Sequence, residues 1–262
     1  MQTTINLDQY PLDQPHSQRW QSVVSKAQTD LARDGMFNLE EFLRPEAAAK
    51  DTALMAARFA SDAFTHARTH NIYFRKNMPD LAPDHPALTR FETINQTLCA
   101  DQLGGTTIAA LYDWPPFAAF LAATMGKPAL YTMDDPLARL NAMNYRQGEG
   151  LNWHFDRSEF TTTLLLQAPE AGSVFEYRSD LRNDDDPNYD GVARLLRGED
   201  PALKALTVTP GTLNVFRGKN TAHRVTPAIG PRSRMIAVFS FYDRPGVRFS
   251  TEDQLGFYGR AA

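Results

Sequence analysis

The stretch from residue 136 to residue 250 is a succession of short extended segments separated by turn residues, and this feature restricts the fold more than any other. Strand composition or alternation occurs at 138–145, 152–156, 161–167, 173–177, 207–208, 213–216, 223–226 and 235–242. Glycine and proline lie between these segments, as at Gly148, Gly172 and Pro210. Several short strands at close spacing are typical of an all-β sandwich or barrel. We therefore expect a mainly β core over residues 136–250.

Residues 1–135 follow a different, helical pattern. Apolar residues recur at helical spacing between 17 and 35, and residues 44–68 are rich in alanine, with Pro45 near the start, where its missing N–H costs little. A third helix is expected over 117–125, ended by Gly126, and a short one around 192–196. Residues 78–86 contain three prolines and predict a loop. We expect one domain over 1–262, in which the mainly helical residues 1–135 flank the β core and residues 251–262 form a C-terminal tail.

Charge and cysteine content exclude several classes of protein. The 262 residues carry a net charge of -4, with a pI of about 5.9, so the basic surface needed for nucleic-acid binding is absent. Cys99 is the only cysteine, which excludes an intrachain disulfide and fits a reducing compartment. The N-terminus lacks an apolar signal segment, and Pro115 and Pro116 interrupt the longest apolar stretch. We expect a cytoplasmic protein that acts on a small-molecule substrate, has no membrane or nucleic-acid partner, and has a homodimer as a candidate assembly.

Three residues of the β region have the types and the order of a metal site. His154 and Asp156 alternate along a predicted strand, so their side chains should project from the same face. A His-x-Asp tripeptide alone is a weak signal, but His223 lies on a later predicted strand and can supply a third ligand. Two histidines and one carboxylate leave other coordination positions open, as in the non-haem Fe(II) oxygenases. We predict that these three residues bind one iron and form the catalytic centre.

Two arginines follow the distal histidine. Arg232 and Arg234 share one face of a predicted strand. An arginine deep inside a barrel is costly unless it meets an anion, and the guanidinium fork suits a carboxylate. The alternative is that both arginines are exposed to solvent where the strand starts. The sequence favours an anionic cosubstrate bound by at least one of them.

Two clusters of polar residues are candidates for binding the substrate. They comprise Arg68, His70, Asn71 and Tyr73 in the first cluster and Tyr131, Asp134 and Asp135 in the second. Together they offer both signs of charge, which an amino acid would need for its carboxylate and its ammonium group in a closed pocket. The alternative is ordinary helix-end and loop chemistry. His66 and His70 have a spacing that could bind a metal on a helix, but packing or substrate contact is favoured.

These motifs together resemble those of the Fe(II)/2-oxoglutarate-dependent oxygenases, whose fold is a double-stranded β-helix of the jelly-roll or cupin-like type. The resemblance covers residues 139–243 and includes His154-x-Asp156, His223 and the arginine after it. Within that superfamily the chain is most similar to the bacterial branch of free-amino-acid hydroxylases and halogenases. This closer similarity rests on segments 153–156, 164–167, 175–177, 210–213 and 223–227.

The resemblance also implies the cofactors and the residues that hold them. It implies Fe(II), O₂ and the cosubstrate 2-oxoglutarate, whose keto acid end binds the iron and whose far carboxylate binds Arg234. Arg232 is the alternative anchor, because counting forward from His223 favours it, whereas counting back from the end of the next strand favours Arg234. Tyr145, in a Tyr-x-x-Gly segment like that of the prolyl hydroxylases, and Gln167 are expected beside the cosubstrate.

Asp156 bears on the outcome of the reaction. In the halogenases of this branch a small residue replaces the metal-binding carboxylate and leaves a position for chloride. Asp156 fills that position, so the resemblance implies hydroxylation of a small polar metabolite, with a free amino acid or a close derivative as the first candidate. Two alternatives stay open: a cupin-type metalloenzyme that does not use 2-oxoglutarate, and a non-catalytic small-molecule sensor on the same fold.

Overall fold

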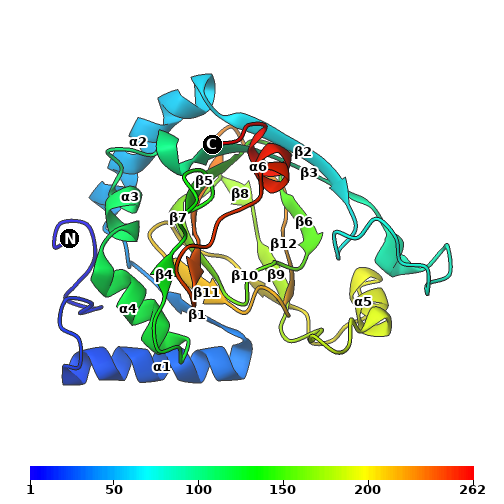
Figure 1. Cartoon of the computed structure of the whole chain (residues 1–262), viewed down its shortest axis with the longest axis horizontal. Helices are drawn as coiled ribbons and strands as arrows, with labels where there is room; N and C mark the ends of the chain where they lie inside the picture. The colour runs from blue at the N-terminus through cyan, green and yellow to red at the C-terminus, as the bar shows by residue number, and fades with distance from the viewer.

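The computed structural model, which describes residues 1–262, is built around two antiparallel sheets (Figure 1). The larger sheet contains, in spatial order, β1 (Met36–Leu39), β11 (Leu213–Phe216), β7 (Thr161–Gln167), β14 (Arg234–Phe239), β5 (Leu140–Tyr145), β3 (Phe91–Cys99) and β2 (Phe64–His70). The smaller sheet contains β10 (Lys204–Leu206), β9 (Phe175–Arg178), β12 (Ala222–Val225) and β6 (Leu151–His154). Two short pairs are β8 (Ala171–Gly172) with β13 (Ala228–Ile229) and β4 (Tyr131–Thr132) with β15 (Phe241–Tyr242). The predicted mainly β, double-stranded β-helix core is confirmed.

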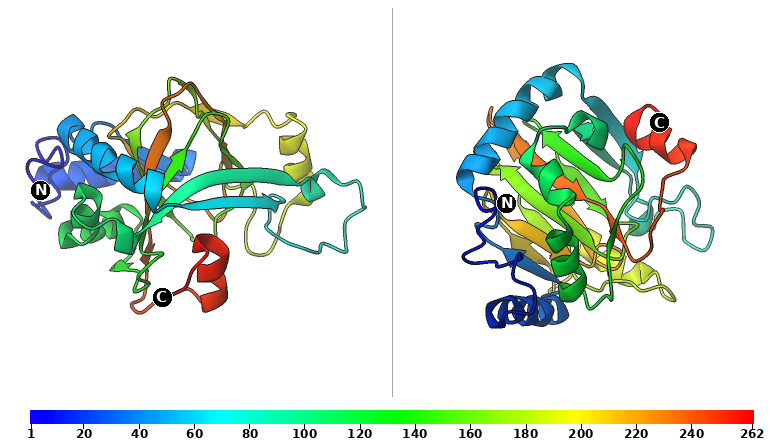
Figure 2. Two further views of the ribbon diagram at one scale, coloured as in Figure 1. Left: turned by 90° about the horizontal axis from the view of Figure 1, so that it is seen from above. Right: turned by 60° about the vertical axis from the view of Figure 1, so that its left-hand side comes forward.

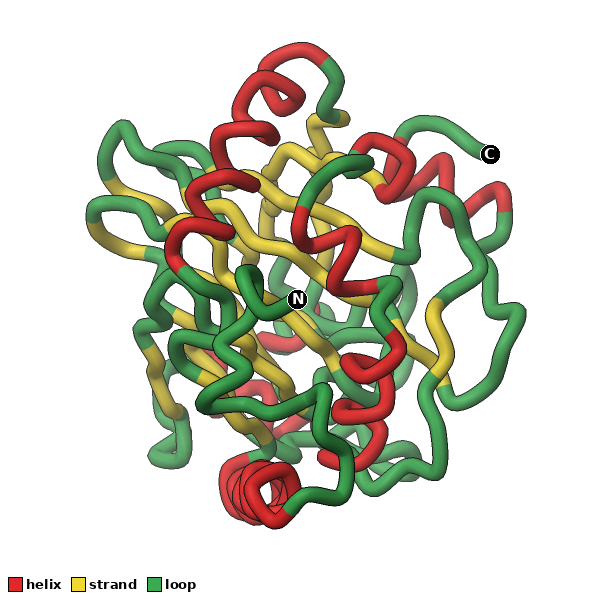
Figure 3. Tube along the Cα trace, turned by 90° about the vertical axis from the view of Figure 1, so that its left-hand side faces the viewer, coloured by secondary structure: helices red, strands yellow, loops and turns green.

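Helices lie outside this core. They are α1 (Gln18–Asp34), α2 (Pro45–Ser61), α3 (Thr107–Tyr112), α4 (Pro115–Thr124), α5 (Tyr189–Leu196) and α6 (Thr251–Tyr258), with single 3₁₀ turns η1 (Pro86–Leu88) and η2 (Ala100–Gln102). The first four α-helices gather on one side of the larger sheet (Figures 2 and 3). The predicted first helix is confirmed: the Ser17 hydroxyl accepts from the Trp20 N–H, and Gly35 ends the helix at φ 74°.

The two faces of the larger sheet have different neighbours. On β14, Met235 and Ala237 belong to the apolar core shared with the helices, while Arg234 and Ile236 line a cavity on the other face. This is the period of two expected of a strand. One face therefore stabilises the fold by burying apolar area, which leaves the opposite face free to carry polar groups.

The N-terminal part is less helical than predicted, because it supplies three strands of the larger sheet. The helix predicted over 44–68 ends at Ser61, and β2 follows it, with β3 after the predicted loop. These two strands form a long hairpin at the edge of the sheet (Figure 2). The β-branched Thr65 and Thr69 disfavour helix and fit a strand, but the alanines before them extend the helical pattern in the sequence.

Residues 251–262 also differ from the predicted tail, because most of them form helix α6. Ser250 caps its first turn by accepting from the Asp253 N–H, and Gly259 ends it at φ 68°. The helix lies against β2, where the ring of Phe257 stacks on His66 at 6.3 Å. None of the helices combines the length and the apolar character that crossing a bilayer requires.

Candidate metal centre and cavity

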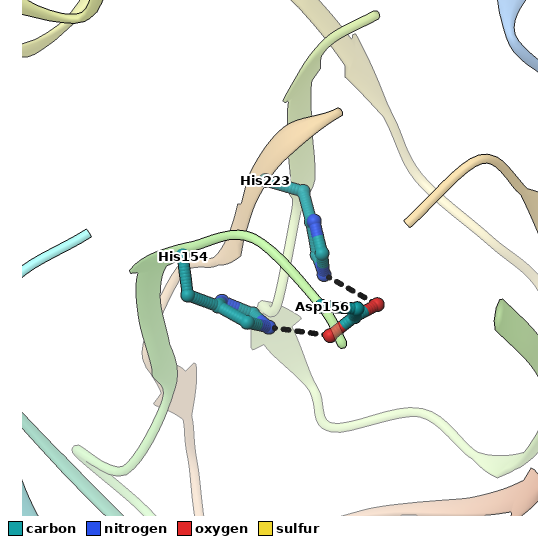
Figure 4. Close-up of side chains that lie close together, drawn as sticks. All are labelled: His154, Asp156 and His223. Atoms are coloured by element: carbon teal, nitrogen blue, oxygen red, sulfur yellow. Dashed lines mark ion pairs between the residues drawn. The ribbon is translucent and has the colours of Figure 1, made fainter. Parts of the chain in front are cut away.

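The two predicted histidine ligands face each other across one rung of the smaller sheet. β6 ends at His154, β12 carries His223, and these two residues are register partners. Asp156 lies beyond the end of β6, and its carboxylate oxygens are 3.3 Å from Nε2 of His154 and 3.4 Å from Nε2 of His223 (Figure 4). One ligand atom from each residue lies within 4.8 Å of the others. The strand ends at His154, so the expected strand alternation does not extend to Asp156, yet the three side chains converge.

Hydrogen bonds fix how the two imidazoles are presented. Nδ1 of His154 is 2.8 Å from the Asn152 carbonyl oxygen, and Nδ1 of His223 is 2.9 Å from that of Thr221. A carbonyl only accepts, so each Nδ1 carries the proton and each Nε2 lone pair is free for a metal. Burial lowers the pKa of His223 to about 4, which keeps this imidazole neutral, as metal ligation requires. The donor set therefore fits a divalent iron.

The Asp156 carboxylate is held by its neighbours. The Thr161 hydroxyl donates to Oδ2, and the Asp156 N–H donates to the Gly218 carbonyl at 3.1 Å. Burial alone raises the pKa of Asp156, but the His223 and His154 imidazoles and the Thr161 hydroxyl outweigh it, so the net pKa lies below its ordinary value. A Cβ on Gly218 would lie 2.4 Å from Oδ2, so only glycine allows this close approach.

A cavity of about 320 Å³ opens beside the triad, and one buried arginine lies in it. Arg234 is 8% exposed, and its guanidinium makes no hydrogen bond or ion pair with the protein and lies 5.5 Å from the centre of the Tyr145 ring. Burial lowers the pKa of Arg234, because a charge without a partner is unfavourable in a buried site. An anionic ligand would offset this cost, so the cavity fits a carboxylate beside the metal site.

The other predicted cosubstrate residues divide between the cavity and its surroundings. Tyr145 lines the cavity and is the register partner of Arg234. Arg232 is exposed, and its only polar contact is with the Pro169 carbonyl at 3.4 Å. Gln167 lies outside the cavity and donates to the Ser233 carbonyl at 2.8 Å, which ties β7 to the residue before Arg234.

The first predicted substrate cluster reaches the cavity only in part. Arg68 and His70 line it. Asn71 lies behind them, where its side-chain oxygen accepts from the N–H groups of Tyr73 and Arg75. The Tyr73 hydroxyl donates to the Pro187 carbonyl at 2.5 Å and points away from the cavity lining.

The second predicted substrate cluster does not line the cavity at all. Tyr131 is 43% exposed, and Asp134 is exposed. Asp135 is fully buried, but its carboxylate accepts from the N–H groups of Leu137, Ala138 and Phe249 and from the Gln254 amide. Asp135 therefore anchors the segment that leads into α6 and has no direct route to a bound molecule.

Several cavity residues were not predicted from the sequence. They come from the β2–β3 hairpin, the turn after the metal ligands and the C-terminal segment: Phe74, Thr93, Asn95, Arg157, Phe249 and Phe257. The alternation of polar Thr93, Asn95 and Thr97 with other residues along β3 is the one signal that could have identified a strand facing a polar cavity.

A family model covers nearly the whole chain. The model described as Halogenase D (HalD) matches residues 20–251, which include the complete metal triad and Arg234. The chain belongs to the Halogenase D family. The predicted place in the hydroxylase and halogenase branch of the Fe(II)/2-oxoglutarate oxygenases is thereby confirmed. No curated protein sequence matches this member of the Halogenase D family.

Solved structures with the same fold come from several bacteria. A protein from Burkholderia pseudomallei, titled as an oxidoreductase of the 2OG-Fe(II) oxygenase family, is 14% identical, with 86% of this chain and 92% of that one covered and a TM-score of 0.54. AviO1 from Streptomyces viridochromogenes Tue57 is 16% identical, with 85% and 96% covered and a TM-score of 0.57. A Pseudomonas putida prolyl-4-hydroxylase is 14% identical, with 82% and 97% covered and a TM-score of 0.51. At these identities the likeness establishes the fold of this Halogenase D family member.

Proposed function

We propose that this protein is an Fe(II)- and 2-oxoglutarate-dependent oxygenase that hydroxylates a small molecule. The observation that carries the proposal is the pairing, in one cavity, of a His–Asp–His triad with a buried arginine that has no protein anion. A solved structure of the epimerase SnoN, which shares the fold, contains Fe3+ and alpha-ketoglutarate. Here His154, Asp156 and His223 would hold the iron, and Arg234 would hold the far carboxylate of 2-oxoglutarate.

The overall reaction consumes O₂, 2-oxoglutarate and a substrate C–H bond, and it yields succinate, CO₂ and the corresponding alcohol. The iron, when bound, supplies the O₂ chemistry, for which three protein ligands leave coordination positions open. Arg234 would orient the cosubstrate through its guanidinium fork, which lysine lacks. The apolar residues around the cavity exclude water from the reacting atoms.

Hydroxylation is proposed over halogenation because of Asp156. The family takes its description from a halogenase, and a chloride on the metal would need the position that the Asp156 carboxylate occupies. The Thr161 hydroxyl holds that carboxylate, and the Gly218 carbonyl holds the Asp156 backbone, so Asp156 would be kept in place as a ligand when the metal is bound. A small polar metabolite, with a free amino acid or a derivative first, stays the predicted substrate class, which the next subsection narrows.

Each alternative function differs from the proposed one in a testable way: the first gives Arg234 no role, and the second predicts no turnover. A cupin-type metalloenzyme would use the triad but not the arginine, and a sensor would bind 2-oxoglutarate without consuming it. Purified protein supplied with Fe(II), 2-oxoglutarate and O₂ is expected to release succinate slowly even without substrate. Tight 2-oxoglutarate binding with no succinate would instead establish the sensor.

A panel of amino acids and carboxylates, assayed with chloride present, tests the outcome of the reaction. A compound that accelerates succinate release should yield a product heavier by one oxygen. The Asp156→Gly variant should lose this product. A chlorinated product from the unaltered protein would overturn the assignment of hydroxylation.

A further inference from the structure

Arg68 is a second arginine of the cavity that lacks a protein partner. It projects from β2, and its guanidinium lies 4.5 Å from the centre of the Phe74 ring and 5.6 Å from that of Phe257. The two aromatic rings position the cation but offer its N–H groups no ordinary acceptor, and the Arg68 guanidinium makes no hydrogen bond or ion pair. The N–H groups of the Arg68 guanidinium are therefore available to bind a ligand in the cavity.

One aromatic ring connects Arg68 to the metal site. Phe74 lies 5.9 Å from the ring of His154 and 4.3 Å from that of His70. Its φ of 54° is unfavourable for a bulky side chain, and the Asn71 side chain holds this conformation through three hydrogen bonds to the backbone of Tyr73 and Arg75. Phe74, held in this left-handed backbone conformation, therefore forms a fixed part of the cavity wall that is near both Arg68 and His154.

The cavity offers no partner for a substrate cation. Its only lining carboxylate is Asp156, which the metal site uses. Arg157, the other cation at this end, is already paired with Asp253 of α6 at 2.7 Å. Asp134 and Asp135 lie outside the lining. An ammonium group buried here would lack a counter-ion, whereas a carboxylate would find Arg68.

His70 adds no charge. Its Nδ1–H donates to the Asn71 carbonyl, and its Nε2 accepts from the Thr93 hydroxyl, which itself accepts from the Asn152 N–H. Burial lowers the pKa of His70 to about 4, so the imidazole is neutral at physiological pH.

Besides the polar side chains of Thr93, Asn95 and Thr97 on β3, the remaining walls of this end carry many aromatic rings. They include Phe74, Phe160, Phe241, Phe249 and Phe257. The cavity volume of about 320 Å³ must hold both cosubstrate and substrate, and it lies at the small end of the roughly 300–1,000 Å³ found for small-molecule sites. The substrate is therefore small and has an apolar body.

We infer that the substrate is a small carboxylate with an aromatic or aliphatic body and no free ammonium group, whose carboxylate pairs with Arg68 beside Phe74. This inference rests on the proposed function and narrows it. Like the predicted amino acid, the inferred substrate has a carboxylate, but its amine must be absent or blocked.

Three probes that share a phenylethyl body test the charge preference. 3-Phenylpropanoate, L-phenylalanine and 2-phenylethylamine carry a carboxylate, both charged groups and an ammonium group, respectively. Each is titrated calorimetrically, without O₂, into the protein loaded with Fe(II) and saturating 2-oxoglutarate, so that Arg234 is occupied. We expect 3-phenylpropanoate to bind at least tenfold more tightly than L-phenylalanine, and the amine not to bind. Equal or tighter binding of L-phenylalanine, or no binding of 3-phenylpropanoate, overturns the inference.

Substitutions at Arg68 test the contact itself. Arg68→Gln should weaken 3-phenylpropanoate at least tenfold, and Arg68→Lys should weaken it less because the charge remains. The exposed Arg194 of α5 provides the matched control, since Arg194→Gln should leave probe binding unchanged. Unaltered probe affinity in both Arg68 variants overturns the inference.

The proposed function is checked on the same protein preparations through 2-oxoglutarate affinity and, after O₂ is admitted, through succinate release without a probe. If the unaltered protein neither binds 2-oxoglutarate nor releases succinate, the proposed function is wrong. If both are observed but L-phenylalanine binds more tightly than 3-phenylpropanoate, only the inferred substrate class is wrong.

Discussion

The two ends of the cavity are built in different ways. At the metal end, His154, His223 and Arg234 come from strands β6, β12 and β14, and their positions follow from sheet register. At the substrate end, the walls come from the β2–β3 hairpin and from α6, which are distant in sequence and meet through Arg68, Phe74 and Phe257. The metal end is a property of the core, while the substrate end depends on how outer segments dock. The two ends should therefore respond separately to substitution.

The largest effect is expected at the metal end. His223→Ala removes one of three ligands, so stoichiometric iron binding and all succinate formation should be lost. Metal content per chain after loading with Fe(II) measures this. His16→Ala, at an exposed histidine, is the control and should keep both properties. Full iron content and activity in the His223 variant would show that the triad is not the metal site.

A smaller loss should follow from a change beside the Asp156 ligand. In Gly218→Ala the new Cβ would collide with the Asp156 carboxylate, so iron affinity should fall by roughly 10–100-fold, as is typical when the support of a metal ligand is disturbed. Competition with a chelator measures the affinity. Gly104→Ala has open space around its Cβ and should behave like the unaltered protein. Equal affinities in the two variants would place Asp156 outside the metal site.

The cosubstrate contact belongs to the same end. Arg234→Lys keeps the charge but loses the fork, so the dissociation constant of 2-oxoglutarate should rise more than about tenfold, or about 1.4 kcal/mol, with iron content unchanged. Arg232→Lys serves as the control and should have little effect, since Arg232 is exposed. The reverse result would move the anchor to Arg232.

Asp135 allows the two ends to be separated. Asp135→Asn turns a buried acceptor of four hydrogen bonds into a poorer one, so the free energy of unfolding should fall by about 1–3 kcal/mol. Two of these bonds reach Phe249 and Gln254 near α6, so binding of 3-phenylpropanoate should weaken severalfold while iron and 2-oxoglutarate affinities hold. The neighbouring exposed Asp134 gives the control Asp134→Asn. If iron and 2-oxoglutarate affinities fell together with probe binding, the two ends of the cavity would not be independent.

The same division explains what could be predicted from the sequence. The bounds predicted for 161–167 and 213–216 coincide with β7 and β11, because apolar and β-branched residues mark these buried strands. The metal triad was identified because the chemistry demands histidine and carboxylate at fixed places. Both signals are local, so one sequence contains them.

The substrate end could not be predicted in the same way. Both faces of β2 carry polar residues, since one face lines the cavity and the other is exposed, so the usual apolar alternation is missing. Asp135 was predicted to bind the substrate because it is charged. Its role in the structure depends on α6, which lies more than a hundred residues later. Long-range docking of this kind leaves no local pattern.

The pairing of His154 with His223 across one rung has a consequence for how the protein acquires its metal. Backbone hydrogen bonds between β6 and β12 set the separation of the two imidazoles, and these bonds form whether or not an ion is present. Because the positions of the two histidines are fixed before a metal binds, the site cannot favour iron by changing its geometry. Since nickel, copper and zinc bind nitrogen and oxygen ligands more tightly than Fe(II), the resident metal depends on which ion is supplied during production. Inactive preparations should regain activity after stripping and reloading with Fe(II).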